Sequence, residues 1–149
     1  MRISTKFSDS IHLLSFISIF KTEKLTSEFI ASSIKTSPVV VRRMIGELRL
    51  AGLISPYQGG KSPQLSRPPV DISLFDVYSA VEHKKPLFNI DKDTNPHCPV
   101  GAHVPDVLRS IYSEAEAAAF GQLGRTTLQD VIDRIQVAHQ RYGEGTAEA

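Results

Sequence analysis

Two short amphipathic segments joined by a tight turn constrain the fold of this 149-residue chain more than any other feature. The second segment, residues 37–53, places apolar residues at helical spacing on one face: Val41, Met44, Ile45 and Leu48. Its opposite face carries Arg42, Arg43, Gly46 and Arg49. Ser37 is a suitable N-cap, and Pro38 suits the first turn. A helix with an apolar back, a basic front and an exposed start is shaped to enter the major groove of DNA.

The residues around this helix predict two more helices and a β-hairpin. An apolar helix comes first, Thr26 can cap the second helix, and residues 35–37 form the turn into the third. Residues 53–57 and 64–65 are typical of two short strands, and residues 58–61 form a glycine turn between them. Three helices followed by a hairpin make a winged helix-turn-helix. The predicted fold class is therefore mainly α with a small β-hairpin wing, an α+β arrangement.

The second half of the chain predicts helices separated by a long loop. After a short fourth helix, residues 83–103 lose their periodicity and contain three prolines. Loops of this length are usually functional or mobile. A long helix is predicted over residues 104–120, and a last helix follows a cap at Thr126 or Thr127. Residues 143–149 are predicted to form a disordered tail.

The formal net charge of +1 conceals a strong asymmetry. Residues 1–67 contain ten Lys or Arg and four Asp or Glu, a net charge of +6. Residues 68–149 contain seven and twelve, a net charge of −5. A basic first half favours a nucleic-acid partner for that part of the chain. The single cysteine excludes an intrachain disulfide and fits a cytoplasmic protein, and no window is apolar enough to span a bilayer.

Four motifs in order carry a family resemblance. They are MRISTKFSDSIHLL, SPVVVRRMIGELRLAGLI, SRPPVDISLFDVYSAVE and NPHCPVG. Together they resemble the Rrf2 family of bacterial winged helix-turn-helix transcription regulators, the IscR/NsrR/CymR group. The resemblance extends from Met1 to about Ile135. It implies a homodimer that binds double-stranded DNA at an inverted-repeat operator, usually as a repressor, and it implies no enzymatic activity.

The resemblance also implies a division of the chain and a set of functional residues. The parts are a winged helix-turn-helix DNA-binding domain at residues 1–82, a sensor-type loop at 83–103, dimerisation helices at 104–142 and the tail. The residues expected at the DNA are Thr26, Ser37, Pro38, Val39, Val40, Arg42, Arg43, Arg49, Lys61 and Arg67. The residues expected at the dimer interface are Val104, Leu108, Ile111, Ala115 and Ala118.

Two departures from the family pattern affect these expectations. Many members have consecutive glycines before an aromatic-basic pair in the wing, whereas this chain has residues 61–65, KSPQL, at that position. The wing keeps Lys61 and Arg67 for phosphate or minor-groove contact but lacks the central arginine. Cluster-binding members carry three cysteines in the loop, and this chain has only Cys98. Iron–sulfur clusters need several thiolate ligands, so no cofactor is expected.

Cys98 with His97 and His103 admits several interpretations. A thiol near a helix start or a protonated histidine is reactive, so Cys98 can serve as a redox or electrophile sensor. Alternatively, Cys98 packs the loop as a small buried residue. These three residues are also metal-type ligands, although their spacing matches no strong signature, and Cys/His catalysis is the weakest interpretation. A small-molecule or oxidant effector is the partner that this loop implies.

A different class of function also fits a winged helix. Such domains serve as protein-interaction or scaffold modules that do not contact DNA. The basic face of the third helix distinguishes the two classes, because a scaffold has no need to keep Arg42, Arg43 and Arg49 together with Lys61 and Arg67. The sequence therefore favours DNA binding over a scaffold role.

Overall fold

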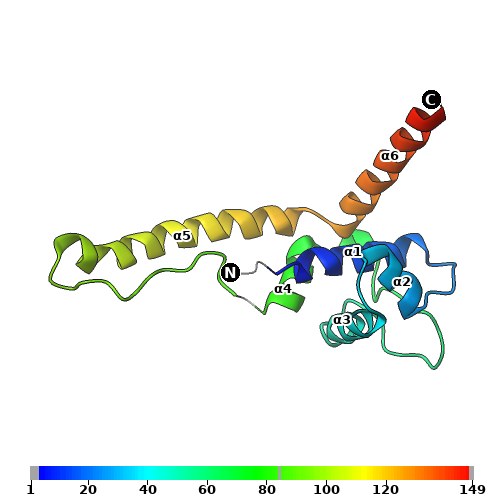
Figure 1. Cartoon of the computed structure of the whole chain (residues 1–149), viewed down its shortest axis with the longest axis horizontal. Coiled ribbons are helices and arrows are strands. Elements are labelled where there is room, and N and C mark those ends of the chain that lie inside the picture. Colours follow the sequence, from blue (N-terminus) through cyan, green and yellow to red (C-terminus); the bar gives the residue numbers. More distant parts are fainter. Residues whose placement is uncertain (1–3, 84, 148–149) are drawn as a thin grey trace.

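Six α-helices and one short 3₁₀ helix make up the regular structure of residues 4–83 and 85–147, which are the residues that the computed structural model describes. In chain order they are α1 (Lys6–Ile19), α2 (Ser27–Ile34), α3 (Pro38–Leu50), η1 (Pro69–Asp71), α4 (Leu74–Glu82), α5 (Pro99–Arg125) and α6 (Leu128–Ala147). Figure 1 shows α1 to α4 gathered into one body, from which α5 projects as a long rod. We call residues 4–83 with the first turns of α6 the head, and α5 with the loop at residues 85–98 the arm.

The core of the head forms around the apolar face of α3. All four apolar residues that the sequence placed on this face are buried. The same cluster includes fully buried side chains of α1, α2 and α4, namely Leu13, Leu14, Ile17, Ile30 and Val77. Leu128 and Ile132 join the cluster from the start of α6. Removing these side chains from water stabilises the head and fixes the opposite face of α3 toward solvent.

The wing has less regular pairing than the sequence predicted. Its two segments meet at a single antiparallel bridge between Ile54 and Leu65. The Ser55 N–H donates to the Gln64 carbonyl at 2.9 Å, and the Ser66 N–H donates to the Leu53 carbonyl at 3.1 Å. Longer strands do not form because a proline follows Ser55 and another precedes Gln64, and proline cannot donate to a ladder.

The long helix is longer than the prediction over residues 104–120. It starts at Pro99, where a proline suits the first turn, and it continues through two glycines to Arg125. Pro105 therefore lies inside the helix rather than in its first turn. Its missing N–H would have bonded the Gly101 carbonyl, and the Thr94 hydroxyl donates to that carbonyl instead at 2.6 Å. This substitute hydrogen bond explains why the helix tolerates an internal proline.

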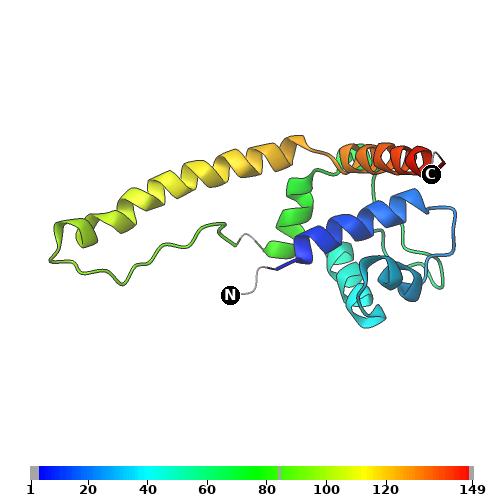
Figure 2. The same cartoon turned by 45° about the horizontal axis from the view of Figure 1, so that its top comes forward.

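The arm touches the head mainly near its C-terminal end. Phe120 packs against Phe75 and Tyr78 of α4, with ring centroids 5.3 and 5.2 Å apart. Farther along the arm, Glu116 accepts the Leu87 N–H at 2.6 Å, which holds the loop against α5. Figure 2 shows the other end of α5 far from the head. No residue of α5 is buried within the described part of the chain.

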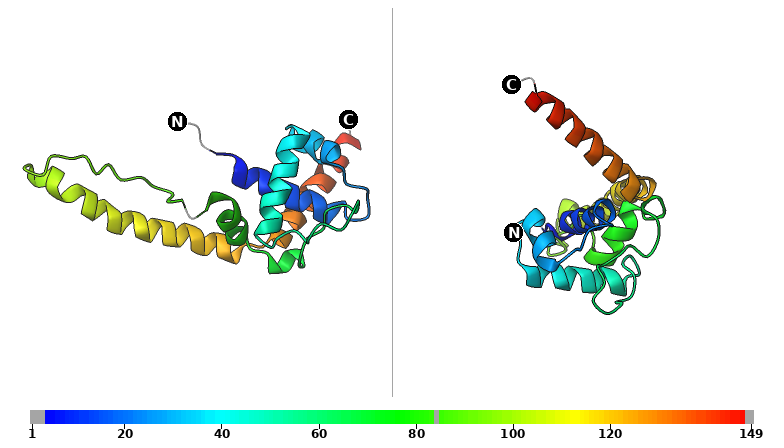
Figure 3. Two further views of the ribbon diagram at one scale, coloured as in Figure 1. Left: turned by 90° about the horizontal axis from the view of Figure 1, so that it is seen from below. Right: turned by 90° about the vertical axis from the view of Figure 1, so that its right-hand side faces the viewer.

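The last helix begins at the predicted cap and extends further than expected. Thr127 accepts the Asp130 N–H at 3.1 Å, and the Asp130 carboxylate accepts the Thr127 N–H at 2.8 Å. Figure 3 shows α6 leaving the head and projecting away from it. The helix continues to Ala147, into the segment 143–149 for which the sequence predicted a disordered tail, and 148–149 lie outside the described residues. Among the described residues, no helix combines the length and apolar character needed to cross a membrane.

Candidate nucleic-acid interface

The turn between α2 and α3 is closed by local hydrogen bonds that the sequence predicted in part. Thr26 caps α2 by accepting the Phe29 N–H at 3.1 Å, and Ser37 caps α3 by accepting the Val40 N–H at 3.3 Å. Between them, Lys35 ends α2 in the left-handed conformation, with φ of 59°. These bonds fix the direction in which α3 leaves α2. The exposed start of α3 results from this turn.

The outward face of α3 presents both apolar and basic side chains to solvent. Val39 is 66% exposed although it is apolar, and Pro38 and Val40 beside it are half-buried. Arg42 and Arg43 are both exposed one turn further along. Short apolar side chains can contact thymine methyl groups, and arginine can pair with guanine or clamp a phosphate. The N-terminal half of α3 therefore has the side chains that base recognition requires.

The two exposed arginines remain available for a ligand. Arg42 lies 3.9 Å from a carboxylate oxygen of Glu28 on α2, and both side chains are more than half exposed. An exposed pair at this distance is weak and easily exchanged for a phosphate. Arg43 forms no ion pair with any residue that the structure describes. Nearby, the carboxylate of Glu47 is paired with Lys6 at 2.7 Å.

The wing is tied to the start of α2, which adds a second basic point. Lys61 is exposed in a tight turn after Gly59 and Gly60, two glycines with positive φ. The next residue, Ser62, accepts the Leu25 N–H at 2.9 Å. This bond joins the wing to the residue that precedes Thr26. Sequence reasoning missed Ser62, because nothing in the local pattern links two segments 37 residues apart.

Arg49 does not join the other arginines, contrary to the sequence expectation. Its Nε donates to the Ser55 carbonyl at 2.9 Å, and its guanidinium lies over the Tyr57 ring at 5.7 Å. Arg49 shares a face with Arg42, but it lies about 10 Å further along the helix axis. At that point the start of the wing covers the helix. Arg49 therefore holds the wing to α3 instead of facing solvent.

Arg67 is likewise engaged inside the head. Its guanidinium donates to the Asp76 carboxylate at 3.2 Å, to the Asp71 carbonyl at 2.9 Å and to the Gly52 carbonyl at 3.4 Å. These bonds join the end of the wing to α4. The expected phosphate contact would need this network to open, so the structure does not place Arg67 with Lys61. Sequence reasoning had no local signal for this partnership.

The predicted dimer residues lie along the exposed side of the arm. Val104 is 38% exposed and Ile111 is 53% exposed, Leu108 is half-buried, and Ala115 and Ala118 are exposed. Their spacing alternates between four and three residues, which is the heptad spacing of helices that pair along one seam. Exposed apolar side chains at this spacing are typical of helices that pack against a partner.

Cys98 occupies the N-cap position of α5 and is half-buried. The backbone N–H groups of Gly101 and Val100 lower the pKa of the Cys98 thiol below its usual value of 9.0, because they stabilise the thiolate. His97 and His103 are both exposed. The structure brings no three His, Cys, Asp or Glu side chains together as a metal site within the residues it describes.

Comparisons with known proteins agree with this geometry. A winged helix-turn-helix with an exposed basic helix defines a DNA-binding protein. A family model described as "Rrf2: Iron-dependent Transcriptional regulator" matches residues 3–134, so the chain belongs to the Rrf2 family. It is 38% identical over 133 residues to "Putative HTH-type transcriptional regulator YwnA" of Bacillus subtilis, and the match covers 89% of this chain and 98% of YwnA.

Solved structures show the same fold. A crystal structure titled "a putative DNA binding protein" is 36% identical, with a TM-score of 0.68, and the match covers 85% of this chain and 98% of that chain. CymR, the global cysteine regulator of B. subtilis, superimposes with a TM-score of 0.67 at 19% identity, covering 90% of this chain and 98% of CymR. This chain is a DNA-binding transcriptional regulator, and its relatives are regulators rather than enzymes.

The family description names iron, and the residues of this chain do not fit an iron–sulfur cluster. Such clusters are held by several cysteine thiolates, occasionally with histidine. This chain supplies one thiol, at Cys98, and no cluster of three candidate ligands surrounds it in the described structure.

Proposed function

We propose that this protein is a homodimeric repressor that inserts α3 of each subunit into the major groove at an inverted-repeat operator. The observation that carries this proposal is the exposed face of α3, where Val39, Arg42 and Arg43 are free of strong internal partners. An apolar tip beside two arginines suits base edges in the groove. A repressor of this kind acts in the cytoplasm, where its operator lies.

The surroundings of α3 supply contacts to the DNA backbone. Thr26 and Ser37 are exposed at the starts of two helices, where N–H groups and the helix dipole favour phosphate. Lys61 provides a mobile point charge on the wing. Contacts of this kind set the register of the protein on the duplex without reading its sequence. Arg49 and Arg67 support the same surface from within the head.

The arm supports a dimer. A helix of 27 residues is about 40 Å long, and none of its residues is buried in one described chain. The stripe from Val104 to Ala118 is apolar or small at heptad positions, and it suits a second copy of the same helix. Paired arms would place two α3 helices at half-sites about 34 Å apart, one turn of DNA.

The test combines operator selection with a mass measurement. We expect purified protein to select a palindrome from a random DNA pool and to behave as a dimer in light scattering. Ile111→Glu should give a monomer because it places a charge in the proposed seam, whereas Ser113→Glu, on the outer side of the same helix, should remain a dimer. A monomeric wild type, or selection without any sequence preference, would overturn the proposal.

A response to oxidants or electrophiles is a second candidate function, favoured by the lowered pKa of Cys98 at the start of α5. Modification of this thiol would change the loop next to the arm and thereby the spacing of the two heads. Diamide should change operator affinity of the wild type and leave Cys98→Ser unaffected. Equal behaviour of the two proteins would refute this role.

A further inference from the structure

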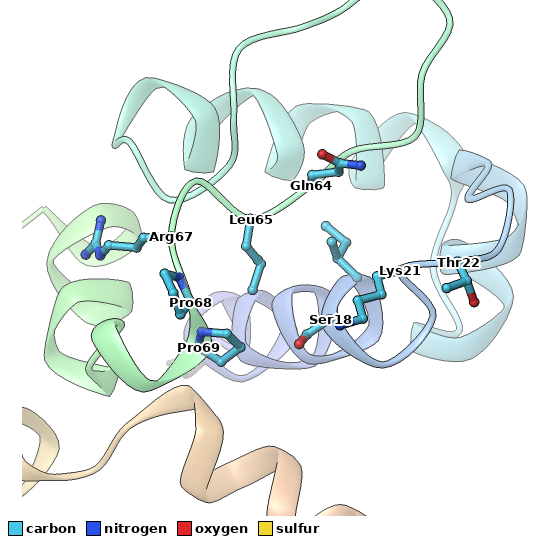
Figure 4. Close-up of a pocket in the computed structure, with 9 residues that line it drawn as sticks. Ser18, Lys21, Thr22, Gln64, Leu65, Arg67, Pro68 and Pro69 are labelled. Carbon is cyan, nitrogen blue, oxygen red and sulfur yellow. The ribbon is translucent and has the colours of Figure 1, made fainter.

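A cleft of about 570 Å³ lies between the end of α1 and residues 64–69. These residues lead back from the wing, and we call them the return segment. Figure 4 shows the return segment crossing over α1, with Leu65 reaching down toward the helix. The volume falls within the range of small-molecule sites, which is about 300–1,000 Å³. None of the residues proposed to read bases lines this cleft.

The cleft combines an apolar interior with one available cation. Ile17, Leu65 and two consecutive prolines, Pro68 and Pro69, provide apolar walls. Lys21 stands at the edge and takes part in no ion pair among the described residues. Arg67 also borders the cleft, but its guanidinium turns away from it toward Asp76. The positive charge offered to an occupant therefore comes from Lys21.

Polar groups beside Lys21 complete the recognition chemistry. Ser18, Thr22 and Gln64 line the cleft next to it, and each can donate a hydrogen bond to an oxygen ligand. No acidic side chain lines the cleft. A cation with hydroxyl and amide donors suits a carboxylate, while the apolar walls suit a hydrocarbon body.

We propose that this cleft binds a small carboxylate with an apolar body, and that its occupancy weakens operator binding. The second part rests on the proposed function, whereas the first part does not. The occupant would lie against both Lys21, just after α1, and Leu65 in the return segment. It would therefore push the wing away from α1.

The connections of the return segment explain how this movement would reach the DNA surface. Leu65 pairs with Ile54, and the Ser66 hydroxyl donates to the Gly52 carbonyl, so this segment rests on the end of α3. On the other side, Ser62 holds the wing to Leu25, next to the cap of α2. A ligand that spreads the cleft would displace Lys61, which precedes Ser62 in the wing. A ligand can shift such an equilibrium only by binding the spread form better.

The experiment measures binding to the full-length protein without DNA. Phenylacetate is the probe, phenylacetamide is its neutral counterpart, and inorganic phosphate tests whether the site takes any anion. We expect millimolar phenylacetate to shift the amide signals of Leu65 and Thr22, with weaker effects from the other two. Lys21→Met should weaken phenylacetate binding by about fivefold, and Lys24→Met, which removes an exposed cation outside the cleft, should leave it unchanged.

A filling variant provides a second readout. Ser18→Trp should occupy the cleft, abolish the phenylacetate shifts and keep the far-ultraviolet circular dichroism of the wild type. Absence of shifts with the wild type, or shifts unaffected by both Lys21→Met and Ser18→Trp, would overturn the cleft as a site. Binding without a fall in operator affinity would overturn the coupling. Failure to bind any DNA would refute the proposed function while leaving the binding result intact.

Discussion

The head and the arm are both helical, but they are held in place by different means. In the head, α3 buries four apolar residues in a core shared with α1, α2, α4 and the start of α6, and its outward face is fixed by that burial. In the arm, α5 is the longest helix of the described chain and buries none of its residues. Its local order comes from a proline at the start, loop hydrogen bonds and the aromatic contacts of Phe120. A surface that is left open in one chain is available to a second chain.

Core truncation should separate the two regions most strongly. Leu48→Ala, at a fully buried site on α3, should lower the free energy of unfolding by about 2–5 kcal/mol at every protein concentration. Ile111→Ala, on the arm, should have an effect that vanishes on dilution because only association depends on it. Urea unfolding at several protein concentrations measures both. A concentration-independent loss with Ile111→Ala would place this side chain in the fold of one subunit.

DNA-binding measurements should separate residues that recognise bases from residues that contact phosphate or hold the dimer together. Arg43→Ala should cost about 1–3 kcal/mol of operator affinity and relax specificity at one base pair, while the protein stays dimeric. Lys61→Ala should weaken binding to all sequences alike and reduce the salt slope by about one. Ile111→Glu should lose the full operator but keep the sequence preference for a half-site. Titrations against full and half operators at two salt concentrations distinguish these patterns, and identical losses for Arg43→Ala and Lys61→Ala would contradict the assignment of α3.

Two aspartates that pair with arginines offer a smaller comparison. Asp76 accepts the Ser73 N–H at 2.9 Å and pairs with Arg67 at 3.2 Å, so Asp76→Ala should destabilise the head by about 1 kcal/mol. Among the described residues, Asp106 pairs with Arg109 alone, three residues along the exposed surface of α5. Asp106→Ala should therefore cost about 0.2–0.5 kcal/mol. Thermal unfolding of both variants checks the order, and a larger loss for Asp106→Ala would reverse it.

The junction between the regions should respond to acid. The N–H and hydroxyl of Thr127 lower the pKa of the Asp130 carboxyl below its usual 3.8, because both stabilise the carboxylate. A carboxyl with a depressed pKa stabilises the fold above its ordinary pKa, and this contribution is lost as the pH falls through the folded value. The protection factors of the amides in the first turn of α6 should therefore fall below about pH 4 in hydrogen-exchange measurements. Asp130→Asn should lack this component, and an unchanged acid response in that variant would assign it to another group.

The helical pattern of α3 and its capping were predictable from sequence because they depend on neighbours within one or two turns. Val41 and Leu48 are buried as expected, and Thr26, Ser37 and Thr127 all cap the helices that they precede. The four sequence motifs likewise predicted a DNA-binding regulator, and the comparisons confirm the family. The division into domains and the roles of Cys98 and the dimer residues remain predictions.

The sequence on its own determined which segments are helical, which face of each helix is apolar and about where each helix begins. Periodicity assigns a side chain to a face, but it does not report what lies over that face. Only the tertiary structure showed that Arg49 binds the Ser55 carbonyl of the wing and that Arg67 pairs with Asp76. In each case a turn of the chain separates the two partners, so helical periodicity does not link them. The cleft beside Lys21 likewise exists only because the fold places α1 and the return segment side by side.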